Sequence, residues 1–230
     1  MSMNNILIMI RKQMKDTFKN KAVLIQLILL PVVSFILERV IRPEGVPELM
    51  YTKMFAAMYM AMAPLTAMSA IIAEEKEKNT LRVLMMSNVK PGQYLTGIGA
   101  YVWIISMIGS VLFAVSFPAA DMPFFFLVMG VGFLISIVIG AVIGITAKNQ
   151  MSAGSVGAMA MIILSFIPMF AMFNEGIGAV ARFLYTQQTR FLLDSMSFAE
   201  IKWDGAVILA ANAILAVVMF FVAYRKKGLE

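Results

Sequence analysis

The sequence predicts an all-α membrane protein with six transmembrane helices and an N-terminal amphipathic helix at the membrane interface. Three observations carry this prediction. Of the 230 residues, 61% are hydrophobic and only 14% are charged, which is more apolar surface than a soluble domain of this size can bury. Six apolar runs have close to the ~20 residues that cross a bilayer, and the charged residues gather between them. We therefore expect a single transmembrane domain over residues 1–230.

The N-terminal segment, residues 4–20, has the pattern of an interfacial helix. Leu7, Ile10, Met14 and Phe18 recur every three to four residues, and basic residues occupy positions between them. A helix with one apolar and one cationic face lies along a membrane surface. No small-residue cleavage site follows, so a signal peptide is not expected. A simple charged tail is the alternative.

The six expected spans differ in length but share the same apolar character. They are Ala22–Leu37, Met54–Ala73, Tyr94–Phe117, Phe124–Ala147, Met151–Phe173 and Ala206–Tyr224. The first is short, and we expect Glu38 and Arg39 at its end to reach the headgroups. Most basic residues fall in segments that share one side of the membrane in this topology: 4–21, 74–92, 148 and 225–227. The positive-inside rule then places both termini in the cytoplasm.

Composition excludes several classes of function. Histidine and cysteine are absent, so we expect no metal site, and no phosphate-binding G-x-x-x-x-G-K-[ST] motif occurs, so we expect no ATP hydrolysis and no catalytic residue in this chain. The net charge of +6 comes from clusters at the ends of apolar runs. That distribution favours membrane lipids over nucleic acid as a partner.

Few polar residues occur within the runs, and no carboxylate lies near the centre of any run. A proton- or sodium-coupled carrier would need such a carboxylate. Two interpretations are open for the polar residues: hydrogen bonds between helices, or the lining of a substrate pathway. The residues in question are Gln26, Thr66, Ser69, Ser165 and Asn212.

Small residues form a stripe in the fourth run, at successive i+4 positions. This pattern indicates close helix packing, either inside the subunit or at an interface between subunits. The stripe consists of Gly132, Ser136, Gly140 and Gly144.

A polar segment at 74–97, between the second and third runs, has the pattern of a loop at a membrane face. Glu74 and Lys78 have the favourable i,i+4 spacing, and Asn79 or Thr80 can cap a following short helix. One side of that helix would carry the apolar residues Leu81, Leu84 and Met85, and Lys90-Pro91-Gly92 would return the chain to the bilayer. A short helix with charges and a small apolar face is suited to dock on a soluble protein.

This segment also resembles a known family. The run from Ile72 to Leu84, IAEEKEKNTLRVL, is similar to the I-x-x-E-K/R-E-x-G-T-L-E-x-L stretch of type-2 ABC transporter permeases, the membrane subunits of exporters driven by a separate ATPase. SNVKP at 87–91 resembles the S-P-V-x-x continuation. Asn79 stands where the family usually has Gly, and Ile98 stands where it usually has Lys.

The resemblance implies roles for three segments. Residues 4–20 would form an elbow helix, residues 74–92 a cytoplasmic coupling region, and residues 174–205 an extracellular loop with short re-entrant helices, for which a flexible linker is the alternative. Two permeases, either identical or paired with a sister chain, would bind two ABC ATPase subunits that hold ATP and magnesium. The residues expected to couple to the ATPase are Glu74, Glu75, Glu77, Leu81, Leu84 and Met85.

The sequence thus predicts the transmembrane subunit of an ATP-driven ABC exporter in the bacterial plasma membrane. It would form the pathway for a hydrophobic or amphipathic substrate, such as a drug or peptide, and couple to the ATPase through Glu74–Pro91. The alternatives are sodium export by the same architecture, a secondary carrier, or a membrane immunity or sensor protein without an ATPase.

Overall fold

The computed structural model describes residues 10–11, 13–14, 21–86, 89–197 and 202–228. Within these ranges the chain consists of helices joined by turns, without a strand. In chain order the elements are α2 (Lys21–Ile36), the π-helical η1 (Leu37–Ile41), α3 (Met50–Glu77), α4 (Thr80–Met86), α5 (Pro91–Ala114), α6 (Met122–Thr146), α7 (Gln150–Phe170), α8 (Glu175–Ala181), α9 (Tyr185–Ser195) and α10 (Trp203–Lys227).

In the described part of the chain, five helices are long and apolar enough to cross a membrane: α3, α5, α6, α7 and α10. This confirms an all-α, multi-pass membrane fold. The expected span Ala22–Leu37 corresponds to α2, which has 16 residues and leads directly into η1, so a sixth span stays a prediction. The interfacial helix predicted at 4–20 lies mostly outside the described residues.

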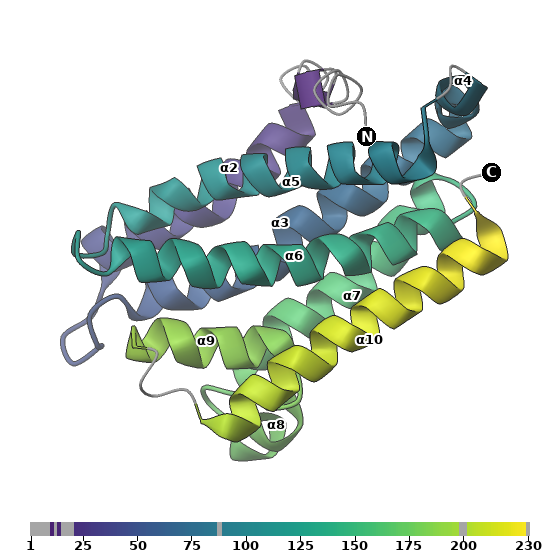
Figure 1. The fold of residues 1–230 in the computed structure, drawn as a ribbon. Coiled ribbons are helices and arrows are strands. Elements are labelled where there is room, and N and C mark those ends of the chain that lie inside the picture. Colours follow the sequence, from purple (N-terminus) through teal and green to yellow (C-terminus); the bar gives the residue numbers. More distant parts are fainter. Residues whose placement is uncertain (1–9, 12, 15–20, 87–88, 198–201, 229–230) are drawn as a thin grey trace.

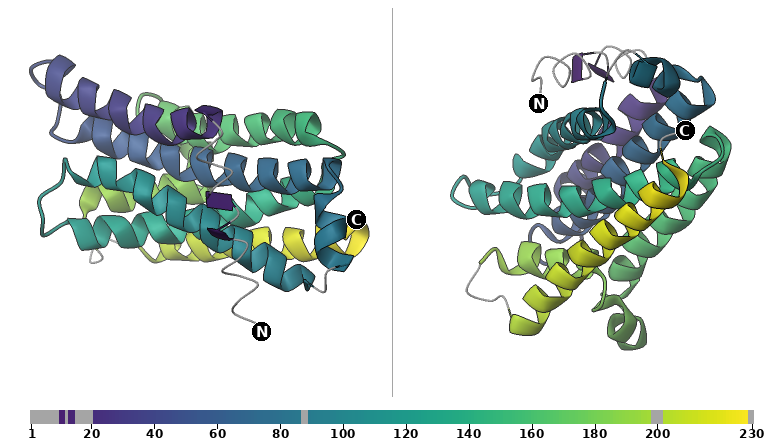
Figure 2. Two further views of the ribbon diagram at one scale, coloured as in Figure 1. Left: turned by 90° about the horizontal axis from the view of Figure 1, so that it is seen from above. Right: turned by 45° about the vertical axis from the view of Figure 1, so that its right-hand side comes forward.

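Helix α3 is the centre of the bundle and packs against α2, α5, α6, α7 and α9 (Figure 1). Its middle is buried on all sides, which fits a helix that is apolar around its circumference. Tyr59, Met60, Leu65, Met68 and Ile72 are among the largest fully buried side chains. Helix α10, by contrast, crosses the outside of the bundle obliquely and leaves most of its apolar side chains exposed (Figure 2).

The small-residue stripe of α6 lies against α3. A Cβ atom on Gly140 would be 2.5 Å from the carbonyl oxygen of Leu65, so only glycine allows this approach of the two backbones. The Ser136 hydroxyl donates a 2.7 Å hydrogen bond to the carbonyl oxygen of Met60. The stripe therefore mediates packing inside the subunit, and it is not available as an interface between subunits.

The start of α3 is capped by the Glu38 carboxylate from η1. This carboxylate accepts hydrogen bonds from the backbone N–H groups of Leu49, Tyr51 and Thr52, at 2.7, 3.1 and 3.3 Å. First-turn N–H groups have no partner within their own helix and attract negative charge. Glu38 is consequently buried, and the expectation that it reaches the headgroups is wrong.

Before α10 begins, the described part of the segment 174–205 contains two short helices, α8 and α9. Helix α9 packs among α3, α6, α7 and α10, at the end of the bundle away from α4 (Figure 1). Arg190 of α9 forms an ion pair of 2.9 Å with Asp194, and Lys53 of α3 donates to the Asp194 carbonyl oxygen. Burial lowers the pKa of Arg190 and raises that of Asp194, while the opposite charges of the pair oppose both shifts.

Candidate functional site

The polar segment at 74–92 begins as a continuation of α3. After Glu77 the chain turns through Lys78 and Asn79 and enters α4. Asn79 has a φ of 56°, the left-handed conformation that commonly ends a helix and that Gly and Asn tolerate best. The Lys78 and Asn79 amides donate 3.0 Å hydrogen bonds to the carbonyl oxygens of Glu74 and Lys76. The turn thus explains how Asn replaces the Gly usual at this position.

Helix α5 starts immediately after Lys90. Pro91 takes the first helical position, where a missing N–H has no cost, and the Gln93 side-chain oxygen accepts a 3.1 Å hydrogen bond from the Lys90 amide. The predicted turn at Lys90-Pro91-Gly92 is therefore the start of the helix that returns across the bundle.

The three predicted carboxylates have different surroundings. Glu74 pairs with Lys78 at the expected i,i+4 spacing, and Glu77 accepts a 2.8 Å hydrogen bond from the amide of Gln150, the first residue of α7. Glu75 is only 6% exposed and accepts a 2.7 Å hydrogen bond from the Gln13 side chain. Glu74 and Glu77 therefore face the surface, whereas Glu75 contacts the N-terminal segment.

The predicted apolar face of α4 packs against the protein itself. Leu81 is 1% exposed and belongs to a cluster with Ile72, Tyr94 and Ile98, and Leu84 is partly buried against this cluster. The expectation that Leu81 offers an exposed contact is wrong, because α4 folds back over the ends of α3 and α5. Met85 lies in α4, but its side chain is outside the described residues.

Two other residues give α4 its exposed apolar surface. Val83 and Met86 are 59% and 80% exposed and lie three positions apart, on the same side of the helix. Neither was predicted, because periodicity locates an apolar face without showing what covers it.

The polar residues within the helices make hydrogen bonds to backbone carbonyl groups. The Thr66 and Ser69 hydroxyls donate within α3, to Met62 and Thr66 respectively. Ser165 of α7 donates to Met58 of α3, and Asn212 of α10 donates to Phe183. The bond of Ser165 agrees with the interhelical interpretation, whereas Asn212 contacts the turn between α8 and α9. The side chain of Gln26 is outside the described residues, and a pathway role for any of them stays a prediction.

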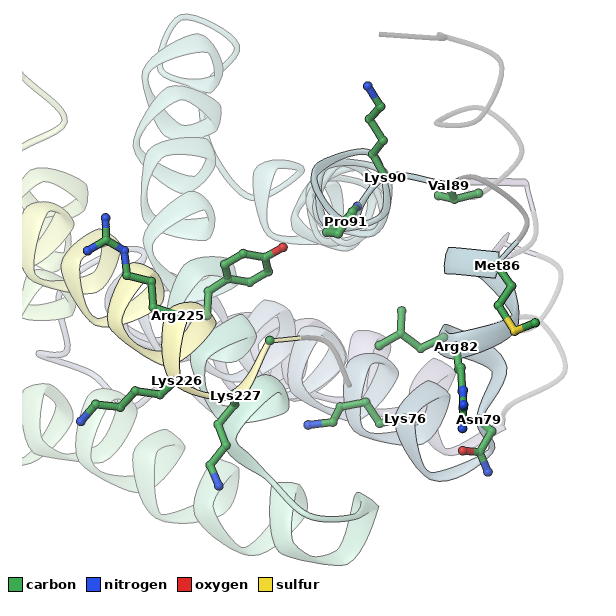
Figure 3. A pocket seen from close by; sticks show the side chains of 13 residues that line it. Lys76, Asn79, Arg82, Met86, Val89, Lys90, Pro91, Arg225, Lys226 and Lys227 are labelled. Carbon is green, nitrogen blue, oxygen red and sulfur yellow. The ribbon is translucent and has the colours of Figure 1, made fainter.

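A cavity of about 1150 Å³ lies between α4 and the ends of α3, α5 and α10. Figure 3 shows Lys76, Asn79 and Arg82 on the α3–α4 side, and Arg225, Lys226 and Lys227 on the α10 side opposite. Six of the 13 residues that line it are basic. The sequence contained a signal for this site, namely the basic clusters at 74–92 and 225–227, but it did not show that the clusters share one cavity.

The fold and this site agree with a comparison to known families. A family model described as "ABC-2 family transporter protein" matches residues 3–225, which is nearly the whole chain and includes the polar segment and all but the last two residues of α10. A search of curated proteins finds no match. The chain therefore belongs to the ABC-2 transporter family, as a multi-pass membrane subunit of an ABC transporter.

Proposed function

We propose that the chain is the permease of an ATP-driven exporter and that its segment 74–92, here called the coupling segment, docks on a separate ATPase subunit that holds ATP and magnesium. Two permeases, identical or sister chains, would enclose a pathway for a hydrophobic or amphipathic substrate such as a drug or peptide. The end of the bundle that carries α4 would face the cytoplasm, together with both termini.

One observation carries this proposal: α3 runs without interruption from the buried centre of the bundle to the coupling segment. Its last turn is also fixed to its neighbours. Lys76 donates to carbonyl oxygens at the end of α6, and Glu77 accepts from the first amide of α7. A displacement of α4 would therefore reach three membrane-spanning helices through direct contacts.

The structure refines which residues would make the docking contacts. Glu74 and Glu77 are the accessible carboxylates, and Val83 and Met86 provide exposed apolar surface. Glu75 and Leu81 hold the coupling segment against the bundle, so we assign them an internal role. A closing ATPase can shift the permease only through contacts that differ between two states, and these four exposed residues are positioned to supply them.

The test is complex formation and ATP turnover with the variants Glu77→Lys and Val83→Asp, together with Leu84→Asp. The complex is purified through a tag on the permease, and the ATPase is identified as the co-purifying chain that azido-ATP labels on illumination. We expect each variant to insert normally but to lose most of this labelled chain and its ATP hydrolysis. Val180→Asp, at an exposed position in α8, is the control and should retain both.

Unchanged recovery of the labelled chain with Glu77→Lys and Val83→Asp would refute the docking assignment. Absence of any azido-ATP-labelled chain from the unmodified complex would refute the ATP-driven mechanism as a whole.

A further inference from the structure

The cavity beside α4 has an unusual charge balance. Six basic residues contribute to its lining: Lys76, Arg82, Lys90, Arg225, Lys226 and Lys227. Among the lining residues that the structure describes, none is acidic. The carboxylates at the end of α3 have other partners: Glu74 pairs with Lys78, Glu75 accepts from the Gln13 side chain, and Glu77 accepts from the amide of Gln150.

Two of these cations are close enough to repel each other. Lys76 and Lys227, from opposite sides of the cavity, interact electrostatically with like charge. The Lys76 ammonium group already donates to the carbonyl oxygens of Ile145 and Ala147, so an anion in the cavity would be held mainly by the other cations. Arg82 can offer several N–H donors to one phosphate, and Asn79 and Tyr224 add further polar groups to the lining.

The position of the cavity indicates where such an anion would come from. It lies where the apolar parts of α3, α5 and α10 end, which is the level of lipid headgroups. Helix α10 leads up to it with an exposed apolar surface that includes Ile214, Val218, Phe221 and Val222. This surface ends at Arg225, whereas Lys227 lies on the opposite side of α10, toward the cavity.

The cavity is also partly apolar. Leu81, Met86, Val89 and Pro91 belong to its lining, so a ligand with a phosphate and a glycerol or acyl portion matches it better than a free anion does. The position of the cavity at the ends of the apolar helices favours a lipid over an acidic protein segment.

We propose that this cavity binds the headgroup of an anionic phospholipid, of the phosphatidylglycerol type, from the leaflet beside α4. The phosphate lies among Arg82, Lys227 and the neighbouring cations, and the acyl chains extend into that leaflet. This binding requires no ATPase, although the cavity shares Lys76, Arg82, Met86 and Lys90 with the coupling segment that we propose to dock on the ATPase.

The experiment uses the purified full chain without any ATPase. Native mass spectrometry and a titration in detergent measure binding of phosphatidylglycerol, phosphatidylcholine and inorganic phosphate. The test variant combines Arg82→Gln with Lys227→Gln. The control combines Arg182→Gln with Lys202→Gln, which removes two exposed cations from a cavity at the other end of the bundle that also contains Asp194 and Asp204.

Each cation near an anionic lipid contributes about a fivefold increase in affinity, so the test variant should bind phosphatidylglycerol roughly 25-fold more weakly. Binding of phosphatidylcholine should be weak and unchanged, and the control variant should resemble the unmodified chain. Thermal unfolding in phosphatidylcholine alone checks that both variants fold.

Three results would overturn the proposal. Equal binding of phosphatidylglycerol and phosphatidylcholine, or an equal loss in the control variant, would show that the cavity does not select anionic lipid. Binding of inorganic phosphate without phosphatidylglycerol would make it a soluble-anion site. Normal binding of phosphatidylglycerol by the test variant would show that Arg82 and Lys227 do not hold the lipid.

Discussion

The Lys76 ammonium group at the end of α3 donates a 2.7 Å hydrogen bond to the carbonyl oxygen of Ile145 at the end of α6. The last carbonyl groups of a helix have no partner within it, and a cation there is stabilising. Lys76→Met keeps the length of the side chain but removes the hydrogen-bond donors, and should lower the free energy of unfolding by about 1–2 kcal/mol. Thermal unfolding in detergent measures this loss of stability. Lys78→Met, in a surface ion pair, should have almost no effect, and equal effects would contradict the assignment.

The turn at Asn79 gives a second prediction. Its left-handed φ of 56° is unfavourable for residues with a Cβ atom other than Asn and Asp, by about 1–2 kcal/mol. Asn79→Ala should therefore lower stability by about 1 kcal/mol, whereas Asn79→Gly should leave it nearly unchanged. Limited proteolysis at 78–82 should be faster for the Ala variant alone. Equal cleavage of both variants would show that the turn does not require this conformation.

The contact between α3 and α6 gives a third prediction. Gly140→Ala would place a methyl group 2.5 Å from the Leu65 carbonyl oxygen. Because the backbone must move to relieve this clash, we expect the free energy of unfolding to fall by about 1–3 kcal/mol. Gly154→Ala in α7 has nothing within 4 Å and should gain up to about 1 kcal/mol from helix propensity. The two unfolding temperatures should move in opposite directions. A neutral Gly140→Ala would mean that the helices are not this close.

The Glu38 cap gives a fourth prediction. Glu38→Ala removes the acceptor for the Leu49, Tyr51 and Thr52 amides and should lower the free energy of unfolding by about 2 kcal/mol. Glu38→Gln should lower it less, because the amide side chain keeps one acceptor oxygen. Hydrogen exchange at the start of α3 should increase in the same order. Glu48→Gln is the control, since Glu48 is exposed in its ion pair with Arg42. If Glu48→Gln raised exchange as much as Glu38→Ala does, the cap would have no special role.

These residues also show how far sequence patterns reach. The long apolar runs predict α3, α5, α6, α7 and α10 because length and composition alone decide whether a helix can cross a bilayer. The pairing of Glu74 with Lys78 is predictable because both residues lie on one turn of helix. The small-residue stripe of α6 predicts close packing for the same local reason, although its partner helix could not be named.

The remaining features depend on residues distant in the chain. Glu75 and Leu81 belong to a charged segment whose pattern indicates exposure. Yet Gln13 covers Glu75, and the ends of α3 and α5 cover Leu81. Helix α9 has five consecutive buried polar residues, Thr186 to Arg190, that any hydropathy pattern places at the surface. Only the packing of neighbouring helices around them determines their burial.

The most direct test of the docking proposal uses the absence of cysteine from the chain. Met86→Cys and Phe183→Cys, both at exposed positions, each provide one thiol for a membrane-impermeant maleimide and for a benzophenone crosslinker. We predict that Met86→Cys reacts only in inside-out vesicles and crosslinks to a chain labelled by azido-ATP, whereas Phe183→Cys reacts in intact cells and gives no such product. Reaction of Met86→Cys in intact cells, or a crosslinked partner that does not bind nucleotide, would contradict the account.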